Sequence, residues 1–377
     1  MKCLFIWYEL YKLFFMSNIS VNIQELEQLL EATPASHNIM LVGNHGIGKS
    51  EILTRFFKEK GMEVVALFLG QMADPGDLIG LPCKDEESGK TDFMPPYWFP
   101  TDGKPIVLFL DELNRARPEI LQTVMDLALN RKLAGKYLPQ GSRIISAVNE
   151  GDQYQLTDLD PALVSRFNIV NFKPTVEEWL LWAKKENLDE RVTGFIAENR
   201  MWLDKDPDSK QGADTGLEKT PDRRAWKRVS DLIKETSELN DFYVKLISSV
   251  VGPKAASAFI QSSSARKILT GKDILQRFND KKIKDEIAKY GIHQLSVVNE
   301  GIFRHLEVEK VTEKNAPLYA ENLMGYFQFL IGKKKEASAH FATLYVKPIY
   351  PKAVNFIVLN CPSLVMLLLS YVNGLKQ

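Results

Sequence analysis

One run of the sequence constrains the fold more than any other: Gly43-Asn44-His45-Gly46-Ile47-Gly48-Lys49-Ser50. It matches the pattern G-x-x-x-x-G-K-[ST], in which the glycines let successive backbone N–H groups turn inward around a phosphate chain. The lysine of this pattern neutralises the outer phosphates, and the final hydroxyl can hold a magnesium ion. We therefore predict that this run, together with the following Glu51, binds the phosphates of a nucleotide.

The residues on either side of this run fit a phosphate-binding loop. The apolar run Asn38–Val42 predicts a strand, and Glu51–Phe57 has the apolar spacing of a helix. The loop would then join a strand to the N-terminus of a helix, where the helix dipole also favours a phosphate. A chance glycine-rich turn is the alternative. The register of strand, loop, helix and Lys49-Ser50 argues against it.

An acidic pair follows the next strongly apolar stretch. The unbroken run Ile106–Leu110 predicts a central parallel strand that is covered on both faces. Asp111 and Glu112 come directly after it, at the end of the strand where ligands bind in open α/β sheets. We predict that Asp111 orients the magnesium ion, directly or through water, and that Glu112 polarises the water that attacks the γ-phosphorus. Stabilisation of a following helix N-terminus is the alternative role for such a pair.

A polar amide follows a further predicted strand, Arg143–Val148. Asn149 would lie beside the acidic pair, where it could position the water or the γ-phosphate. Holding a loop is the alternative. The other predicted elements alternate between helix and strand along the chain: Ile23–Leu30, Met62–Leu69 (a buried strand), Pro118–Leu129, Asp160–Phe167 and Asn168–Phe172. This alternation predicts a three-layer α/β domain with a parallel sheet.

The segment Gln71–Pro100 reads as a long loop. A loop of this length in a compact domain usually has a function, although a surface excursion that its aromatic residues pin down is equally compatible with the sequence. After Thr175 the pattern becomes helical, and beyond residue 240 the apolar spacing of helices continues without residues that suggest chemistry.

The amino-acid composition limits which cellular compartment and which binding partners we expect. Lys+Arg and Asp+Glu are equal at 48 each, so we do not expect a nucleic-acid partner. Three widely spaced cysteines, Cys3, Cys83 and Cys361, suit a reducing compartment, and we expect a cytoplasmic protein. The apolar stretch 1–15 is interrupted by charges, and 353–372 by polar residues and a proline. We expect two buried helical pieces in the second stretch and no membrane segment in either.

Taken together, these motifs resemble those of AAA+ ATPases of the MoxR-like branch. The resemblance covers roughly residues 36–235. Its carriers are the Walker A run Gly43–Ser50, the Walker B run Ile106–Glu112 with its extension Leu113-Asn114-Arg115-Ala116, Asn149 as sensor 1, the box from Leu159 to Arg166-Phe167, and Pro221 to Trp226 in a lid. It implies ATP with Mg²⁺ and an α/β core followed by an α-helical lid. The implied divisions are an extension at 1–22, with Met16-Ser17-Asn18 as a more natural start, the core at 23–174, the lid at 175–240 and a helical region of unknown role at 241–377.

The resemblance also implies roles for two arginines and for other molecules. Arg166 would be the arginine finger that reaches the ATP of a neighbouring subunit, with a salt bridge inside its own domain as the alternative. Arg224 would be the sensor 2 arginine of the lid, and Arg223 competes with it because one extra residue separates Arg224 from Pro221. The family further suggests a hexameric ring, a protein client and a partner that carries a von Willebrand factor A domain.

Two other classes of function stay open at this point. One is a nucleotide-gated scaffold that assembles but turns over negligibly, against which Glu112, Asn149 and Arg166 together argue. The other is a DNA-directed AAA+ protein, against which the balanced charge argues; a steep salt dependence of DNA binding would favour it.

Overall fold

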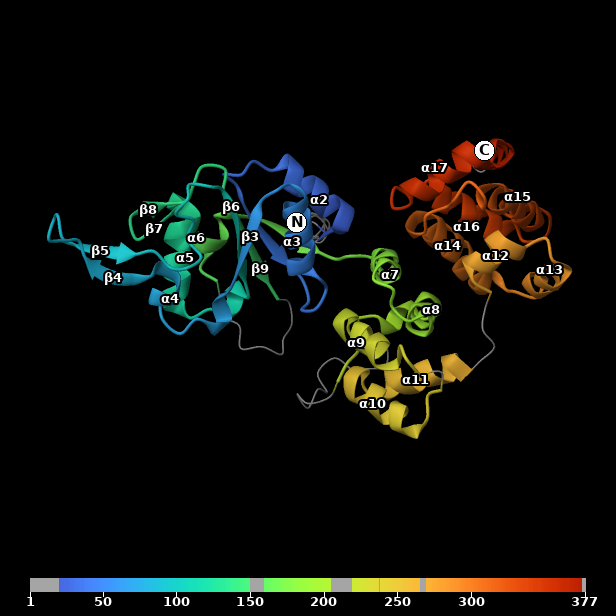
Figure 1. Cartoon of the computed structure of the whole chain (residues 1–377), viewed down its shortest axis with the longest axis horizontal. Helices are drawn as coiled ribbons and strands as arrows, with labels where there is room; N and C mark the ends of the chain where they lie inside the picture. Colours follow the sequence, from blue (N-terminus) through green and yellow to red (C-terminus); the bar gives the residue numbers. More distant parts are fainter. Residues whose placement is uncertain (1–19, 150–158, 205–218, 237, 265–268, 375–377) are drawn as a thin grey trace, which may run out of the picture. The chain divides into compact units, whose positions relative to one another are not determined.

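The computed structural model describes residues 20–149, 159–204, 219–236, 238–264 and 269–374 (Figure 1). The chain divides between Thr175 and Val176 into two compact units. Most of the predicted extension 1–22 lies outside the described residues.

The first unit is built on a six-stranded sheet in the order β1-β10-β2-β9-β6-β3. Every neighbouring pair in it is parallel. The strands are β1 (Ser20–Val21), β2 (Asn38–Val42), β3 (Glu63–Phe68), β6 (Ile106–Asp111), β9 (Arg143–Val148) and β10 (Phe167–Phe172). The run that predicted a central strand is that of β6, which has neighbours on both sides, and the runs that predicted strands at β2 and β9 also form strands with two neighbours. The predicted parallel α/β sheet is therefore confirmed.

Helices cover both faces of this sheet and make it the middle of three layers. Helices α2 (Ile23–Ala32) and α3 (Lys49–Glu59) pack on one face, and α5 (Pro118–Asn130) and α6 (Pro161–Val164) pack on the other (Figure 1). Successive residues of β6 alternate between the two cores: Phe109 joins the core under α2 and α3, and its neighbours Leu108 and Leu110 join the other.

Two expectations for this unit were wrong. Strand β3 is not a buried strand, because it forms the edge of the sheet and exposes Glu63, Ala66 and Phe68. The segment Gln71–Pro100 is not a plain loop. It contains helix α4 (Gly76–Ile79) and the antiparallel hairpin β4 (Leu81–Lys84) and β5 (Thr91–Met94), which projects from the body of the unit (Figure 1).

The base of this hairpin requires a glycine. Gly80 has φ of 88°, and a Cβ placed there would lie 1.9 Å from the carbonyl oxygen of Met94. A second short hairpin, β7 (Lys132–Leu133) and β8 (Lys136–Tyr137), holds the first in place. The Lys136 ammonium donates to the Asp92 carboxylate at 3.0 Å and to the Phe93 carbonyl at 2.9 Å.

The second unit is helical throughout its described residues. Its helices are η3 (Arg200–Trp202), α7 (Val176–Lys185), α8 (Glu190–Glu198), α9 (Arg223–Ile233), α10 (Asp241–Val251), α11 (Pro253–Ser264), α12 (Gly271–Arg277), α13 (Lys281–Ala288), α14 (Ile292–Val308), α15 (Ala316–Lys333), α16 (Lys335–Tyr345), α17 (Pro351–Asn360) and α18 (Pro362–Gly374). The prediction that the chain becomes helical after Thr175 is confirmed.

Two hydrophobic cores organise these helices. One surrounds Trp226 and includes residues of α7 to α11, and the other surrounds Phe303 and Phe341 and includes residues of α12 to α18. Helix α7 contributes to both, because Trp179 and Leu180 lie in the first core and Leu181 in the second. The predicted division between a lid and a C-terminal region at residue 240 stays a prediction.

An ion cluster around one buried carboxylate links the same two groups of helices. Arg200, in η3, pairs with Glu177 of α7 at 2.7 Å and also with the carboxylate of Glu300 in α14. The Glu300 side chain is only 5% exposed and also faces His340 of α16, at 3.6 Å, and Arg304. One carboxylate thus gathers charges from three segments of the chain.

The apolar stretch near the C-terminus forms the two predicted helical pieces, but it is only partly buried. Leu359 of α17 is 80% exposed and Met366 of α18 is 71% exposed. Taken singly, each described helix is too short or too polar to cross a membrane. The pair 351–360 and 362–370 passes the same length and composition test jointly, with a bend of 111° between its halves.

We expect Glu300 to make this unit sensitive to acid. Burial alone would raise the pKa of Glu300, but the nearby His340 ring and the charges of Arg200 and Arg304 outweigh it, and the pKa is lowered from 4.5. The carboxylate therefore stabilises the fold above the pKa of an unfolded glutamate, and this stability is lost as pH falls through the lower folded pKa. Glu300→Gln should cost about 1–3 kcal/mol at neutral pH.

Hydrogen-exchange protection of α14, measured in the full chain from pH 7 to pH 3.5, tests this expectation. Protection in the wild type should fall below about pH 4.5. The Glu300→Gln chain should start lower and change less with pH. Glu313→Gln, which alters an exposed carboxylate, serves as the control and should follow the wild type. Equal pH profiles for Glu300→Gln and the wild type would contradict the role of Glu300.

Candidate nucleotide-binding site

The glycine-rich run lies between β2 and α3, as predicted. The Gly43 amide donates to the Val148 carbonyl of neighbouring β9 at 3.1 Å, and α3 begins at Lys49. Gly46 and Gly48 have φ of 75° and 95°, in the left-handed region that favours glycine. The loop can therefore curl its backbone before the helix begins, while Asn44 and His45 at its tip are exposed.

Gly43 occupies the tightest position of the loop. A Cβ there would lie 2.7 Å from the Phe172 carbonyl oxygen of β10 and 2.9 Å from Ile47 Cδ1. The first of these atoms belongs to the backbone of a paired strand and cannot move aside. The close approach of β10 explains why the loop begins with a residue that has no side chain.

Lys49 is the central charge of the site. Its side chain is buried, with the residue 7% exposed. The ammonium donates to the Gly43 carbonyl at 2.7 Å, to the Asn44 carbonyl at 3.1 Å and to Asn149 Oδ1 at 2.8 Å. These bonds hold the ammonium at the base of the loop, beside the end of β9.

Ser50 and Asp111 supply the oxygen atoms that a magnesium ion prefers. The Ser50 hydroxyl lies 3.3 Å from Asp111 Oδ2, although the two residues belong to α3 and β6. The other carboxylate oxygen of Asp111 accepts the backbone N–H of Glu112 at 2.9 Å. A hydroxyl and a carboxylate converging next to a phosphate loop match the way proteins bind Mg²⁺, through few protein oxygens plus phosphate. The donor set therefore fits Mg²⁺.

Glu112 has an unusual backbone conformation. It lies in the left-handed region with φ of 55°, immediately before the short helix η2 (Leu113–Arg115). Its carboxylate pairs with Arg115 at 2.8 Å, and the side chain remains 25% exposed. Left-handed non-glycine residues cluster at functional sites, where the surrounding structure holds them in place. The backbone of Gly70 closes the other side, since a Cβ on Gly70 would lie 3.0 Å from Glu112 Oε2.

Asn149 lies where the sequence predicted, after β9 and beside β6. Its side chain bonds to Lys49, and its backbone bonds to the side chain of Asn114, which is 4% exposed. Sequence reasoning placed Asn114 and Arg115 inside a motif without giving either a role. The partner of Asn114 is 35 residues away and depends on the fold, whereas Arg115 pairs with Glu112 three residues earlier, a spacing that is visible in the sequence.

Arg166 is not near the other predicted site residues. It directly precedes β10, whose first residue, Phe167, is in register with Asn38 at the start of β2. The Asn38 side chain donates to the Arg166 carbonyl at 3.1 Å. Arg166 therefore lies at the amino edge of the sheet and the loop lies at the carboxyl edge. The length of β2 separates the two by about 15 Å, which is farther than an arginine side chain reaches.

The two candidate lid arginines differ in their surroundings in the second unit. Arg223 is 7% exposed and makes two bonds to the Asp204 carboxylate, at 2.8 and 2.9 Å. Arg224 is exposed on the same helix. An arginine held in a two-bond ion pair is less available to a ligand than an exposed one, which favours Arg224.

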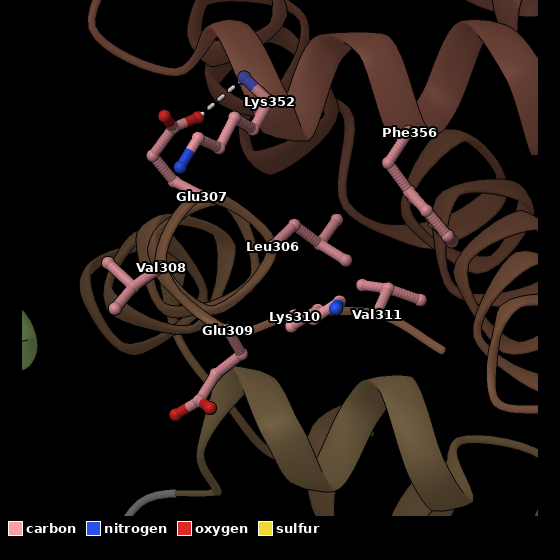
Figure 2. A pocket seen from close by; sticks show the side chains of 8 residues that line it. All are labelled: Leu306, Glu307, Val308, Glu309, Lys310, Val311, Lys352 and Phe356. Carbon is pink, nitrogen blue, oxygen red and sulfur yellow. Dashed lines mark hydrogen bonds between the residues drawn. The ribbon is translucent and has the colours of Figure 1, made fainter. Parts of the chain in front are cut away.

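The second unit also has a hollow of about 400 Å³ at the end of α14 (Figure 2). Glu307 at its rim accepts the backbone N–H groups of Lys352 and Ala353, at 2.8 and 3.1 Å, and so caps α17. The polar atoms of Glu307 thus have a structural use, and we assign no ligand to this hollow.

The fold and the loop define a P-loop nucleotide-binding protein with a parallel α/β sheet. Residues 38–167 match the family model of the AAA domain, dynein-related subfamily. The match begins at the first residue of β2 and ends at the first residue of β10, and it includes the loop, the acidic pair, Asn149 and Arg166. No protein with a curated description matches the chain.

Solved structures resemble the chain only distantly. A candidate ATPase from Cytophaga hutchinsonii is 14% identical with a TM-score of 0.34, and 77% of each chain is covered. The RuvB Holliday junction branch migration motor of Thermotoga maritima is 14% identical with a TM-score of 0.37, over 81% of this chain and 86% of RuvB. NtrX from Brucella abortus is 14% identical with a TM-score of 0.37, over 85% and 69%. Likeness at this level carries no argument about activity.

Gly43→Ala should disable the loop without unfolding the chain. The added methyl group would contact the Phe172 carbonyl and force the loop to shift, so we expect ADP affinity to fall by at least about tenfold. Calorimetric titration with ADP measures this change. Gly194→Ala is the matched control, because a Cβ there meets nothing within 4 Å. Unchanged ADP affinity in Gly43→Ala would contradict the assignment of the loop.

Proposed function

We propose that this chain is an ATP-hydrolysing AAA+ protein that assembles into a ring and remodels, or helps to mature, a protein partner. One observation carries the proposal. Lys49, Asp111 and Asn149 stand at the carboxyl ends of the three adjacent strands β2, β6 and β9, with Ser50 and Glu112 beside them. A cation, two acids, a hydroxyl and an amide in one place are the groups that nucleotide hydrolysis requires.

Nucleotide binding is supported by the loop and its lysine. The backbone N–H groups of the loop and the Lys49 ammonium would hold the phosphates, at the N-terminus of α3. Ser50 and Asp111 would hold Mg²⁺, which neutralises phosphate charge when it is bound. The choice of ATP over GTP rests on the resemblance to the AAA+ family.

Hydrolysis needs a base and a polar group that orients the attacking water. Glu112 would accept the proton of that water as its oxygen attacks the γ-phosphorus and the bond to the ADP oxygen breaks. Asn149 would hold the water or the γ-phosphate with its amide. The Arg115 ion pair has to leave one Glu112 oxygen free for this step, and the 25% exposure of Glu112 is compatible with that.

Ring assembly is supported by the position of Arg166. Arg166 lies at the opposite edge of the sheet from its own loop, which supports a role toward another subunit over one in its own site. A neighbour's arginine would stabilise the charge that develops on the γ-phosphate, and hydrolysis would then depend on assembly. Arg224 of the lid is our candidate for the sensor 2 arginine.

The assignment to the MoxR-like branch rests on sequence resemblance, and the proposal of a protein client rests on one exposed surface. The run Asp111–Ala116 and the box ending at Arg166-Phe167 favour the MoxR-like branch, and with it a hexamer and a partner with a von Willebrand factor A domain. A protein client is supported by the hairpin β4–β5 and the segment after it, where Leu81, Met94 and Tyr97 are 67%, 60% and 92% exposed. Exposed apolar side chains gathered on a projecting element are typical of protein-binding surfaces. The described thiols, Cys83 and Cys361, are free and suit action in the cytoplasm.

Mixing two inactive variants tests the shared site. Arg166→Ala subunits should bind ATP but lose turnover by about a thousandfold, and Lys49→Ala subunits should not bind ATP. In a mixed ring, a Lys49→Ala subunit can supply its arginine to the intact loop of an Arg166→Ala neighbour. Steady-state ATP turnover of the mixture should therefore exceed that of either variant alone.

Two controls make this experiment decisive. Arg228→Ala removes an exposed arginine of α9 and should leave turnover unchanged. Each variant mixed with itself should stay inactive. Failure of the mixture to recover activity, with both variants still able to join wild-type assemblies, would place the action of Arg166 within its own subunit.

A further inference from the structure

The side chain of Asn114 connects the segments that follow β6 and β9, beyond the point where these two strands pair with each other. The ladder between β6 and β9 ends at the pair Leu110 and Ser146. Beyond it, Asn114 Nδ2 donates to the Asn149 carbonyl at 3.0 Å, and Asn114 Oδ1 accepts the Asn149 N–H at 3.4 Å. One buried amide thereby satisfies both backbone groups of a residue 35 positions away in the chain.

This clamp determines where the Asn149 side chain points. Asn149 is itself only 5% exposed, and its Oδ1 accepts the Lys49 ammonium at 2.8 Å. With the Asn149 backbone fixed on both its donor and its acceptor, the amide has one backbone geometry from which to approach the phosphate loop. The turn after Asp111 and Glu112 is thus connected, through Asn114 and Asn149, to Lys49.

We propose that Asn114 is a positioning residue for hydrolysis, which holds the Asn149 backbone so that the Asn149 amide stays aligned with Lys49 and the acidic pair. The proposal rests on the proposed function, because it gives Asn114 a part in turnover. Asn114 acts through Asn149 and does not contact the nucleotide. Residues that orient catalytic ligands in this way typically change activity by about 10- to 100-fold when they are removed.

A purely structural role is the competing explanation, and the chain contains a matched control for it. Asn322 in α15 is 1% exposed, donates to the Leu275 carbonyl at 2.9 Å and accepts the Asn279 N–H at 3.0 Å. It makes the same two kinds of bond as Asn114, but in the C-terminal helices. Loss of either side chain leaves two backbone groups unsatisfied.

The experiment compares Asn114→Ala, Asn322→Ala and the isosteric Asn114→Asp in the full chain. Asn114→Ala should lower kcat for ATP by about tenfold or more and leave ADP affinity within about threefold. Asn322→Ala should lower the melting temperature comparably and leave kcat within about twofold. Asn114→Asp keeps an acceptor for the Asn149 N–H and loses the donor to the Asn149 carbonyl, so its kcat should fall while its fold is retained.

A double-mutant comparison separates positioning from stability. If Asn114 acts through the Asn149 side chain, adding Asn114→Ala to Asn149→Ala should cause little further loss of kcat. An equal loss in both backgrounds would overturn the proposal, and so would an unchanged kcat in a folded Asn114→Ala chain.

Hydrogen exchange supplies a readout that does not depend on turnover. The Asn149 amide should exchange faster in Asn114→Ala than in the wild type and should be unaffected by Asn322→Ala. A wild-type chain that binds ATP but does not cleave it would refute the proposed function. In that case an unchanged exchange rate at Asn149 would refute the clamp separately.

Discussion

The contact between Lys49 and Asn149 is the interaction on which the candidate site depends. It joins the loop after β2 to the end of β9, and the Asn114 clamp extends the connection to the turn after β6. The contact is possible because parallel strands end at the same edge of a sheet, so residues about 100 positions apart in sequence meet without a long loop. Lys49 is buried, and its ammonium donates to the Gly43 carbonyl and to the Asn149 side chain. The parallel sheet thereby brings Lys49 and Asn149 together in one place.

The same strand polarity separates Arg166 from this cluster. A group that precedes a parallel strand and a group that follows one lie on opposite edges, and the length of β2 keeps them apart. The proposed hydrolytic residues therefore lie at one edge and the candidate arginine at the other. In the proposed ring, contact between subunits would bring the two together, so that nucleotide state could bias the geometry of the assembly. In the second unit, the Arg200 and Glu300 cluster and the shared helix α7 connect two helical cores.

Much of the first unit could be predicted because its signals are local. The apolar runs of β2, β6 and β9, and the residues that follow each, mark both the strands and the site. The hairpin β4–β5 could not be predicted, because its strands are short, exposed and interrupted by Pro82, so they lack the alternation of a half-buried strand. The edge position of β3 could not be predicted, because Val64 and Val65 are residue types that are also common in central strands. Asn114 and Arg223 were unpredictable for another reason: their partners, Asn149 and Asp204, are chosen by tertiary structure.

In the function that we propose, bound ATP, an intact Lys49 loop and an arginine from a neighbour form one shared site. The most direct measurement is the molecular mass of the Glu112→Gln protein in solution with and without ATP and Mg²⁺. This variant keeps the loop and the magnesium oxygens and lacks the base, so it should retain ATP. We expect a shift from a small species to a ring of about six subunits on adding ATP. A protein that binds ATP and remains a monomer would contradict the shared site.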